Sequence, residues 1–185
     1  MNIIKIVVLS LLLPLQVKAD AIPLGGIEVK LDVITQPLIK VEKPGGGWYN
    51  RIQLKSNVEN PSIYQTEVPI TVKLHEQDGY RISVKNPLIL TRHAIILRGV
   101  TQQGHPMVSN IQDHQEFSPA EIRWGSDHTN LRLLSAIPET FYVDNSTSRQ
   151  TSTHYLLQIS AQAPRGKNTA GKYHGQLTLL FETNS

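Results

Sequence analysis

Aliphatic and aromatic residues alternate with polar residues along most of this chain. Alternation with a period of two places one set of side chains on the buried face of a β-strand and the other set in solvent. Turn-forming pairs such as Asp78-Gly79 separate the alternating segments, and no long segment has helical spacing. The pattern therefore predicts an antiparallel β-sandwich or barrel. The predicted strands include residues 27–33, 52–54, 68–74, 80–84, 122–124, 131–133, 155–161 and 173–181.

Three segments depart from this alternation. Ser118-Pro119-Ala120-Glu121 begins with a capping serine followed by a proline that suits the first helical position, which predicts a brief helical turn. The polar stretch 145–153 is expected to be an exposed loop. Pro44-Gly45-Gly46-Gly47 fits a hairpin loop better than a phosphate-binding loop, because aromatic residues follow it directly.

The alternating segment at residues 27–33 has an unusual place in the chain, close to the expected start of the mature protein. Gly25-Gly26 precede it and would let the chain bend there. Two interpretations stay open from the pattern alone. The segment is either the first strand of its own sheet or a strand that leaves its own domain and completes a neighbour's. Its apolar residues are Ile27, Val29, Leu31 and Val33.

Residues 1–19 have the features of a secretory signal peptide. Lys5 supplies an early positive charge, and an apolar run follows over residues 6–15. This run is too short to span a bilayer, which needs roughly 20 apolar residues, so we favour a cleaved signal over a membrane anchor. The small or apolar residues around Ala19 allow cleavage before Asp20 or before Ile22. We therefore expect an exported protein.

Composition narrows the function further. The 185 residues contain no cysteine, which excludes disulfides, thiolate metal sites and cysteine nucleophiles. Of the 18 basic residues, Lys5 and Lys18 lie in the predicted signal, which leaves 16 basic against 15 acidic residues. A balance this close to neutral gives no reason to expect a nucleic-acid partner.

The candidate catalytic and metal-binding residues do not form a recognisable motif. Asp113-His114 with Glu116, and Asp127-His128, place ligand types close together, but neither spacing directs three ligands at one point. The chain has no nucleophile elbow and no phosphate-binding motif. We therefore expect no catalytic site, no metal, no cofactor and no enzymatic activity. His174 alternates out of the apolar set and is expected to face solvent.

Three aromatic residues are candidates for stacking on sugars, namely Trp48, Tyr49 and Trp124. Packing in the core or at an interface is the favoured interpretation for all three.

The two ends of the chain resemble a known family. Ile159-Ser160-Ala161, followed by the run from Ala170-Gly171-Lys172-Tyr173-His174-Gly175 to Leu179, is similar to the C-terminal strand region of bacterial chaperone–usher pilins. The similarity is greatest to the major subunits of alpha-type (class 5) colonisation-factor fimbriae. The segment that ends at Pro37, with residues 38–41 after it, resembles the extension and first strand of that family.

The resemblance implies an all-β fold, an incomplete immunoglobulin-like β-sandwich that is completed by donor-strand exchange. It divides the chain into a signal peptide at 1–19, an N-terminal extension at 20–36 and a pilin domain at 37–185. Within the extension, residues Ile27, Val29, Leu31 and Val33 would insert into a neighbouring subunit. The C-terminal strand would border the receiving groove through Tyr173, Gly175, Leu177, Leu179 and Phe181.

The resemblance also implies a function and partners. The protein would be a structural subunit of a fimbria on the cell surface, exported through the periplasm and supporting adhesion to host surfaces. Its partners would be other copies of itself or related pilins, a periplasmic chaperone, an outer-membrane usher and a host receptor. The alternative is a minor or single-domain carbohydrate-binding adhesin of the same fimbrial system.

Overall fold

The structure is a computed structural model that describes residues 27–96, 111–143, 150–166 and 169–184. The predicted signal peptide, both cleavage sites, Gly25-Gly26 and residues 145–149 of the predicted loop lie outside the described residues. Every element in the described part of the chain is a β-strand, which confirms the all-β prediction, and no helix there could cross a membrane. The strands are β1 (Ile27–Thr35), β2 (Ile39–Glu42), β3 (Arg51–Ser56), β4 (Ile63–His75), β5 (Gly79–Val84), β6 (Thr91–Ile96), β7 (Ile111–Glu116), β8 (Glu121–Gly125), β9 (Arg132–Leu133), β10 (Glu139–Tyr142), β11 (Gln150–Gln162) and β12 (Tyr173–Thr183).

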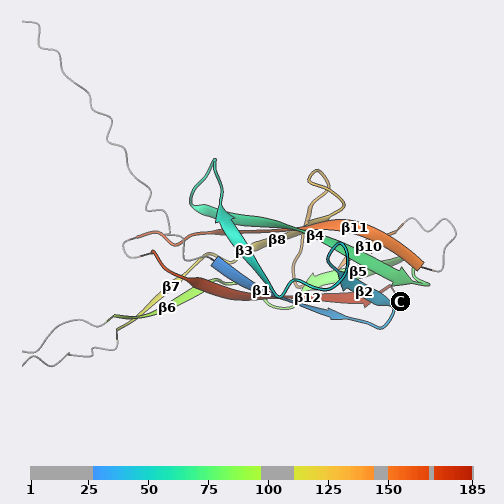
Figure 1. Cartoon of the computed structure of the whole chain (residues 1–185), viewed down its shortest axis with the longest axis horizontal. Coiled ribbons are helices and arrows are strands. Elements are labelled where there is room, and N and C mark those ends of the chain that lie inside the picture. Colours follow the sequence, from blue (N-terminus) through green and yellow to red (C-terminus); the bar gives the residue numbers. More distant parts are fainter. Residues whose placement is uncertain (1–26, 97–110, 144–149, 167–168, 185) are drawn as a thin grey trace, which may run out of the picture.

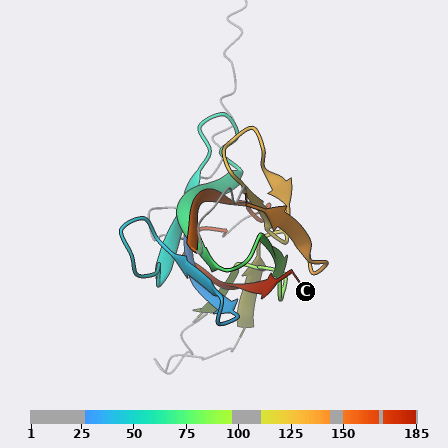
Figure 2. The ribbon, with the colours of Figure 1, turned by 90° about the vertical axis from the view of Figure 1, so that its right-hand side faces the viewer.

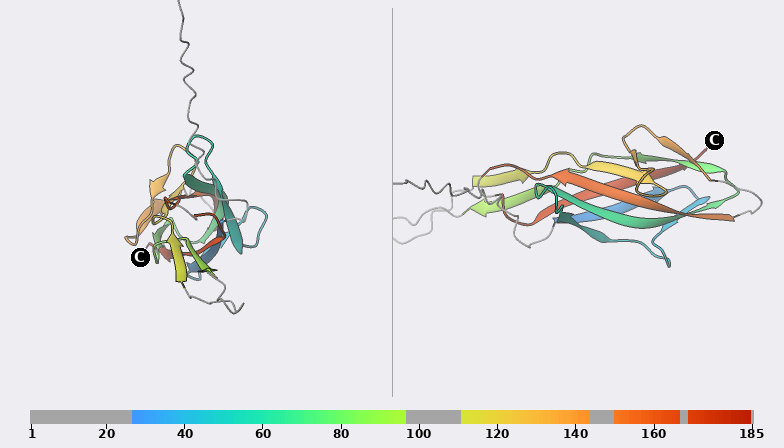
Figure 3. Two further views of the ribbon diagram at one scale, coloured as in Figure 1. Left: turned by 90° about the vertical axis from the view of Figure 1, so that its left-hand side faces the viewer. Right: turned by 90° about the horizontal axis from the view of Figure 1, so that it is seen from above.

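Most of the strands form one hydrogen-bonded path that curls around a single core, while β2 pairs with β4 beside it and the β6–β7 pair joins β12. The order of the path is β10-β5-β12-β1-β3-β4-β11-β8-β9, and the view along the long axis shows the curl (Figure 2). β3 links the two layers, because residues 51–54 pair with β1 whereas Lys55 and Ser56 pair with β4. The result is an elongated β-sandwich, consistent with the immunoglobulin-like class (Figure 3). The β6–β7 hairpin extends from one end of it (Figure 1).

The inward residues of both layers close the core. β4 and β11 pair antiparallel along their full length, from Gln150 opposite His75 to Gln162 opposite Ile63. An aromatic group in the core consists of Tyr80, Trp124, Tyr155 and Phe181, whose rings contact one another. Within it, the Trp124 indole Nε1 donates a hydrogen bond of 2.9 Å to the Tyr80 hydroxyl. Burial raises the pKa of Tyr80 far above its usual value. Trp124 is 0% exposed, so the idea that it stacks on a sugar is wrong.

Three local predictions need correction. Residues 118–120 are not helical, because their backbone donors serve neighbouring segments: Ser118 N–H donates to the Gln162 carbonyl and Ala120 N–H to the Leu88 carbonyl. The expected loop at 145–153 is too long, since residues 150–153 already belong to β11. Residues 44–47 do form a turn, but it joins β2 and β3, which pair with β4 and β1 and not with each other, so it is not a hairpin loop.

Candidate functional site

The first described strand, β1, lies between β12 and β3. It runs parallel to β12, with Ile27 opposite Tyr173 and Thr35 opposite Phe181. It runs antiparallel to β3 over its first four residues, from Ile27 opposite Leu54 to Lys30 opposite Arg51. We call the position between β12 and β3, with its backbone partners on both sides, the slot. The structure contains a single chain with β1 in its own slot, so insertion of β1 into a neighbour stays a prediction.

The inward face of β1 completes the hydrophobic core. Ile27, Val29 and Leu31 are 2%, 0% and 1% exposed, and Val33 is partly buried against the same core. Burying one such side chain contributes about 1.5–3 kcal/mol. A shift of the strand by one residue would turn Glu28, Lys30 and Asp32 into the core, so the alternation fixes the register.

The outward face of β1 carries charged residues that all have partners. Glu28 Oε2 lies 3.3 Å from Arg51 Nη1 on β3 and 3.9 Å from His174 Nδ1 on β12. Asp32 Oδ2 accepts a 2.5 Å hydrogen bond from Gln176 Nε2 and lies 3.2 Å from Lys30 Nζ. These contacts are solvent-exposed, so each contributes only about 0–1 kcal/mol. His174 faces solvent with 63% of its side chain exposed, which confirms the prediction.

Trp48 replaces a missing strand partner of β1. The pairing between β1 and β3 ends at Lys30. One residue later, the Trp48 indole Nε1 donates a 2.9 Å hydrogen bond to the Leu31 carbonyl. The neighbouring Tyr49 hydroxyl donates to the Pro69 carbonyl at 2.9 Å. Both side chains pack against the core, so their observed contacts are structural and not those of an open sugar platform.

β12 forms the other wall of the slot. Tyr173, Leu177, Leu179 and Phe181 are all 0% exposed and point into the core. Gly175 lies opposite Val29, and a side chain there would collide with the segment 88–90 that crosses it. An added Cβ would lie 2.7 Å from Leu88 Cδ1 and 3.0 Å from the Ile89 carbonyl oxygen.

The glycine therefore marks a close backbone approach. The pairing with β1 runs without a bulge from residue 173 to residue 181.

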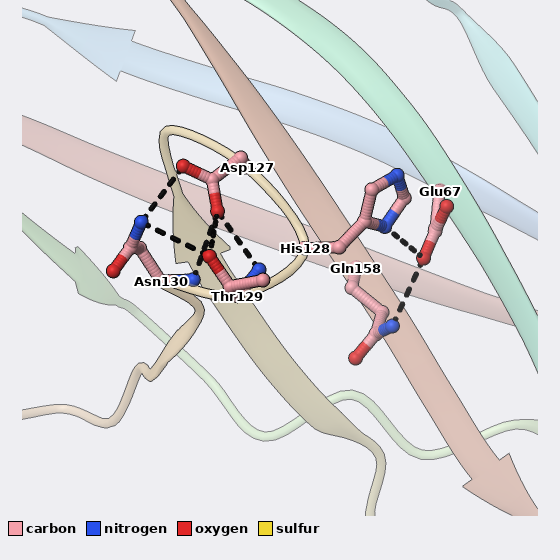
Figure 4. Close-up of polar contacts among 6 residues, drawn as sticks. All are labelled: Glu67, Asp127, His128, Thr129, Asn130 and Gln158. Carbon is pink, nitrogen blue, oxygen red and sulfur yellow. Dashed lines mark hydrogen bonds and ion pairs between the residues drawn. The ribbon is translucent and has the colours of Figure 1, made fainter.

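A second group of polar residues lies at the turn between β8 and β9 (Figure 4). Asp127 accepts hydrogen bonds from the backbone and hydroxyl of Thr129, at 2.8 and 2.6 Å, and from Asn130. These bonds hold the pKa of the Asp127 carboxyl well below its usual value. His128 points away from them, with its Nδ1 3.2 Å from Glu67 Oε1 (Figure 4). Asp127 and His128 therefore do not converge on one point.

No group of three potential metal ligands occurs among the described residues. The side chains of Asp113 and His114 lie outside them.

A third charged group ties β2 to β4. The Glu42 side chain is 8% exposed, and its Oε2 lies 2.8 Å from Lys40 Nζ, while Lys73 contacts its other oxygen. Hydrogen bonds from the two lysines lower the pKa of Glu42 below its usual value, and the bond from Lys40 has the larger effect. Both lysines contact Glu42 on the outward face of β2 and β4, where the Lys40 side chain is 70% exposed, so the group ties these two strands together.

Two comparisons with known proteins bear on this chain. No family model matches it. Among solved structures, it is similar to the CooA pilin subunit from enterotoxigenic Escherichia coli, with a TM-score of 0.45 and 12% sequence identity. The match covers 80% of this chain and 99% of that chain. At this level of similarity, the function has to be inferred from the chain's own strands, above all from β1 and its slot.

Proposed function

We propose that this protein is a structural subunit of a surface fimbria that polymerises when β1 of one copy fills the slot of the next. The observation that carries the proposal is that β1, the first strand of the described residues, completes the core from a position between β12 and β3. A strand of this kind can exchange between identical chains at low cost, because a second copy brings the same side chains to the slot.

The energetics favour exchange over an empty slot. The three fully buried side chains of β1 together contribute on the order of 5–9 kcal/mol. The net stability of a domain is only about 5–15 kcal/mol, so a subunit without a strand in its slot would lose most of it. It would also expose unpaired backbone groups along β12 and β3, which invites aggregation. A strand from another copy restores the lost core contacts and pairs the exposed backbone groups. Its backbone bonds give affinity, and its alternate side chains fix the register.

The direction of donation makes the contact head-to-tail. A donated β1 and a receiving slot are different surfaces, so each subunit keeps one of each free for the next copy. Such contacts build open filaments when the rotation from one subunit to the next does not close a ring. The proposal includes export through the periplasm, a chaperone that protects the slot before assembly, an outer-membrane usher and adhesion to host surfaces. These partners follow from the family resemblance of the two chain ends.

An engineered disulfide that holds β1 in its own slot until it is reduced tests the proposal. Lys30 and Gln176 lie directly opposite each other on the outward face, and the chain has no cysteine of its own. In a Lys30→Cys/Gln176→Cys variant, oxidation should tie β1 into its own slot. We expect the wild type to form head-to-tail oligomers after equilibration in sub-denaturing urea, measured by size-exclusion chromatography and electron microscopy.

The oxidised variant should remain monomeric under the same treatment, and reduction should restore the oligomers. Lys30→Cys alone, with oxidised dimers removed, is the control for the substitution. Oligomers of equal length from the locked and the reduced variant would show that β1 does not exchange.

A further inference from the structure

The sequence of β1 has the same pattern when it is read in either direction. Around Lys30, the order is aliphatic, acidic, aliphatic, lysine, aliphatic, acidic, aliphatic. Reversal about Lys30 exchanges Glu28 with Asp32, and it exchanges the aliphatic residues in pairs. Strict alternation makes the apolar positions symmetric in any strand, so the informative part of the symmetry is the acidic residue on either side of Lys30.

Each acidic position in the slot receives one hydrogen bond, from Arg51 at the position of Glu28 and from Gln176 at the position of Asp32. His174 lies near the position of Glu28 without a hydrogen bond to it. The distances to Glu28 are 3.3 Å from Arg51 and 3.9 Å from His174. If a reversed strand keeps its lysine opposite Gln176, its Asp32 lies opposite His174 and its Glu28 lies near Gln176. Each position then still receives a carboxylate.

The inward face tolerates the same reversal. The reversed strand brings the same four side chains, so the volume that fills the core is unchanged. Volume-conserving exchanges of this kind usually cost less than about 1.5 kcal/mol. The long pairing with β12, which is parallel in this structure, becomes antiparallel, and only the short pairing with β3 becomes parallel. Because antiparallel pairs are slightly more stable per residue, the backbone gains from the change.

Only another copy can supply a reversed strand. β1 continues into β2 through residues 36–38, and a connection of that length spans at most about 14 Å. Reversal would move Thr35 to the other end of the slot, a distance on the order of 30 Å at about 3.3 Å per residue. The chain's own β1 is therefore restricted to the parallel orientation.

We infer that Arg51 and His174 form a receiving site for one carboxylate of a strand that enters the slot. Glu28 fills this site when the chain's own β1 occupies the slot, and Asp32 fills it when β1 comes from a second copy. The inference rests on the proposed function and adds to it the residues by which a subunit distinguishes its own strand from a neighbour's.

Two substitutions with the same change of charge separate the two states. Glu28→Lys places a lysine beside Arg51 and His174 in the monomer, whereas the exchanged strand still brings Asp32 to them. Asp32→Lys leaves Glu28 at the receiving site in the monomer, but puts a lysine there in the exchanged strand. The readout is the ratio of oligomer to monomer for the full mature chain, equilibrated in sub-denaturing urea and measured by size-exclusion chromatography.

We expect Glu28→Lys to raise this ratio and Asp32→Lys to lower it, each by roughly two- to five-fold at low salt, with smaller changes at high salt. Adding Arg51→Glu to Asp32→Lys should restore part of the lowered ratio of oligomer to monomer. If oligomers form but the two variants shift the ratio in the same direction, or leave it unchanged, the receiving site is wrong and the proposed function stands. If the wild type forms no oligomers, the proposed function itself fails.

Discussion

Replacing Leu31 with alanine tests whether β1 closes the core of the isolated chain. Leu31 is 1% exposed and lies in the middle of the inward face of β1. Truncating a buried leucine costs about 2–5 kcal/mol, because it loses transfer free energy and leaves a cavity. With an m-value of roughly 1–3 kcal/mol/M in urea, a loss of this size lowers the midpoint of unfolding by about 1–3 M.

The matched control is Ile34→Ala on the same strand. Ile34 is 41% exposed, so its truncation should change the free energy of unfolding by no more than about 0.5 kcal/mol. Both variants are measured by urea unfolding followed by far-ultraviolet circular dichroism, at two protein concentrations. A monomer with β1 in its own slot gives midpoints that do not depend on concentration. Equal losses from the two truncations would mean that β1 does not lie in its own slot in solution.

Three further predictions concern single contacts. Trp48→Phe removes the donor to the Leu31 carbonyl and should cost about 0.5–1.5 kcal/mol, with faster amide hydrogen exchange after residue 30; unchanged exchange would contradict the contact. Tyr80→Phe leaves the Trp124 indole N–H without its acceptor in the core and should cost about 1–3 kcal/mol in thermal unfolding; a loss below about 0.5 kcal/mol would argue against it. Glu42 has a lowered pKa when folded, so its ion pairs stabilise the fold above the usual carboxyl range and are lost as the pH falls through that lowered value. Glu42→Gln should therefore be less stable than the wild type at neutral pH and equally stable in acid, and a gap independent of pH would count against this role.

The sequence predicted the long strands well, because their alternation is strict. β4, β11 and β12 lie where the period of two places them. β6, β7 and β10 were not predicted, since their segments mix charged, aromatic and aliphatic residues without a regular period. The prediction of a helical turn at residues 118–121 was wrong because local sequence does not show distant partners. A capping serine and a proline describe only the local chain, whereas the partners of this backbone lie at Leu88 and Gln162.

The candidate site was predictable in its residues but not in its geometry. Alternation alone identifies the inward residues of β1, and a glycine at an inward position of β12 is typical of either a close backbone approach or a bulge. The parallel pairing with β12 joins segments that are 146 positions apart, as for Ile27 and Tyr173, and a single sequence carries no signal of it. The contact from Trp48 to a backbone carbonyl of β1 is equally invisible, because any carbonyl can accept that bond.

The placement of the two tryptophans makes intrinsic fluorescence a measure of whether β1 occupies its slot. Trp48 touches β1 at the edge of the sandwich, whereas Trp124 is sealed inside the aromatic group of the core. When the strand leaves, the Trp48 indole becomes exposed to solvent and its fluorescence emission shifts to longer wavelength. The emission of Trp124 stays unchanged and serves as an internal reference. The lifetime of a strand in its slot can thus be timed by stopped flow on the unlabelled protein.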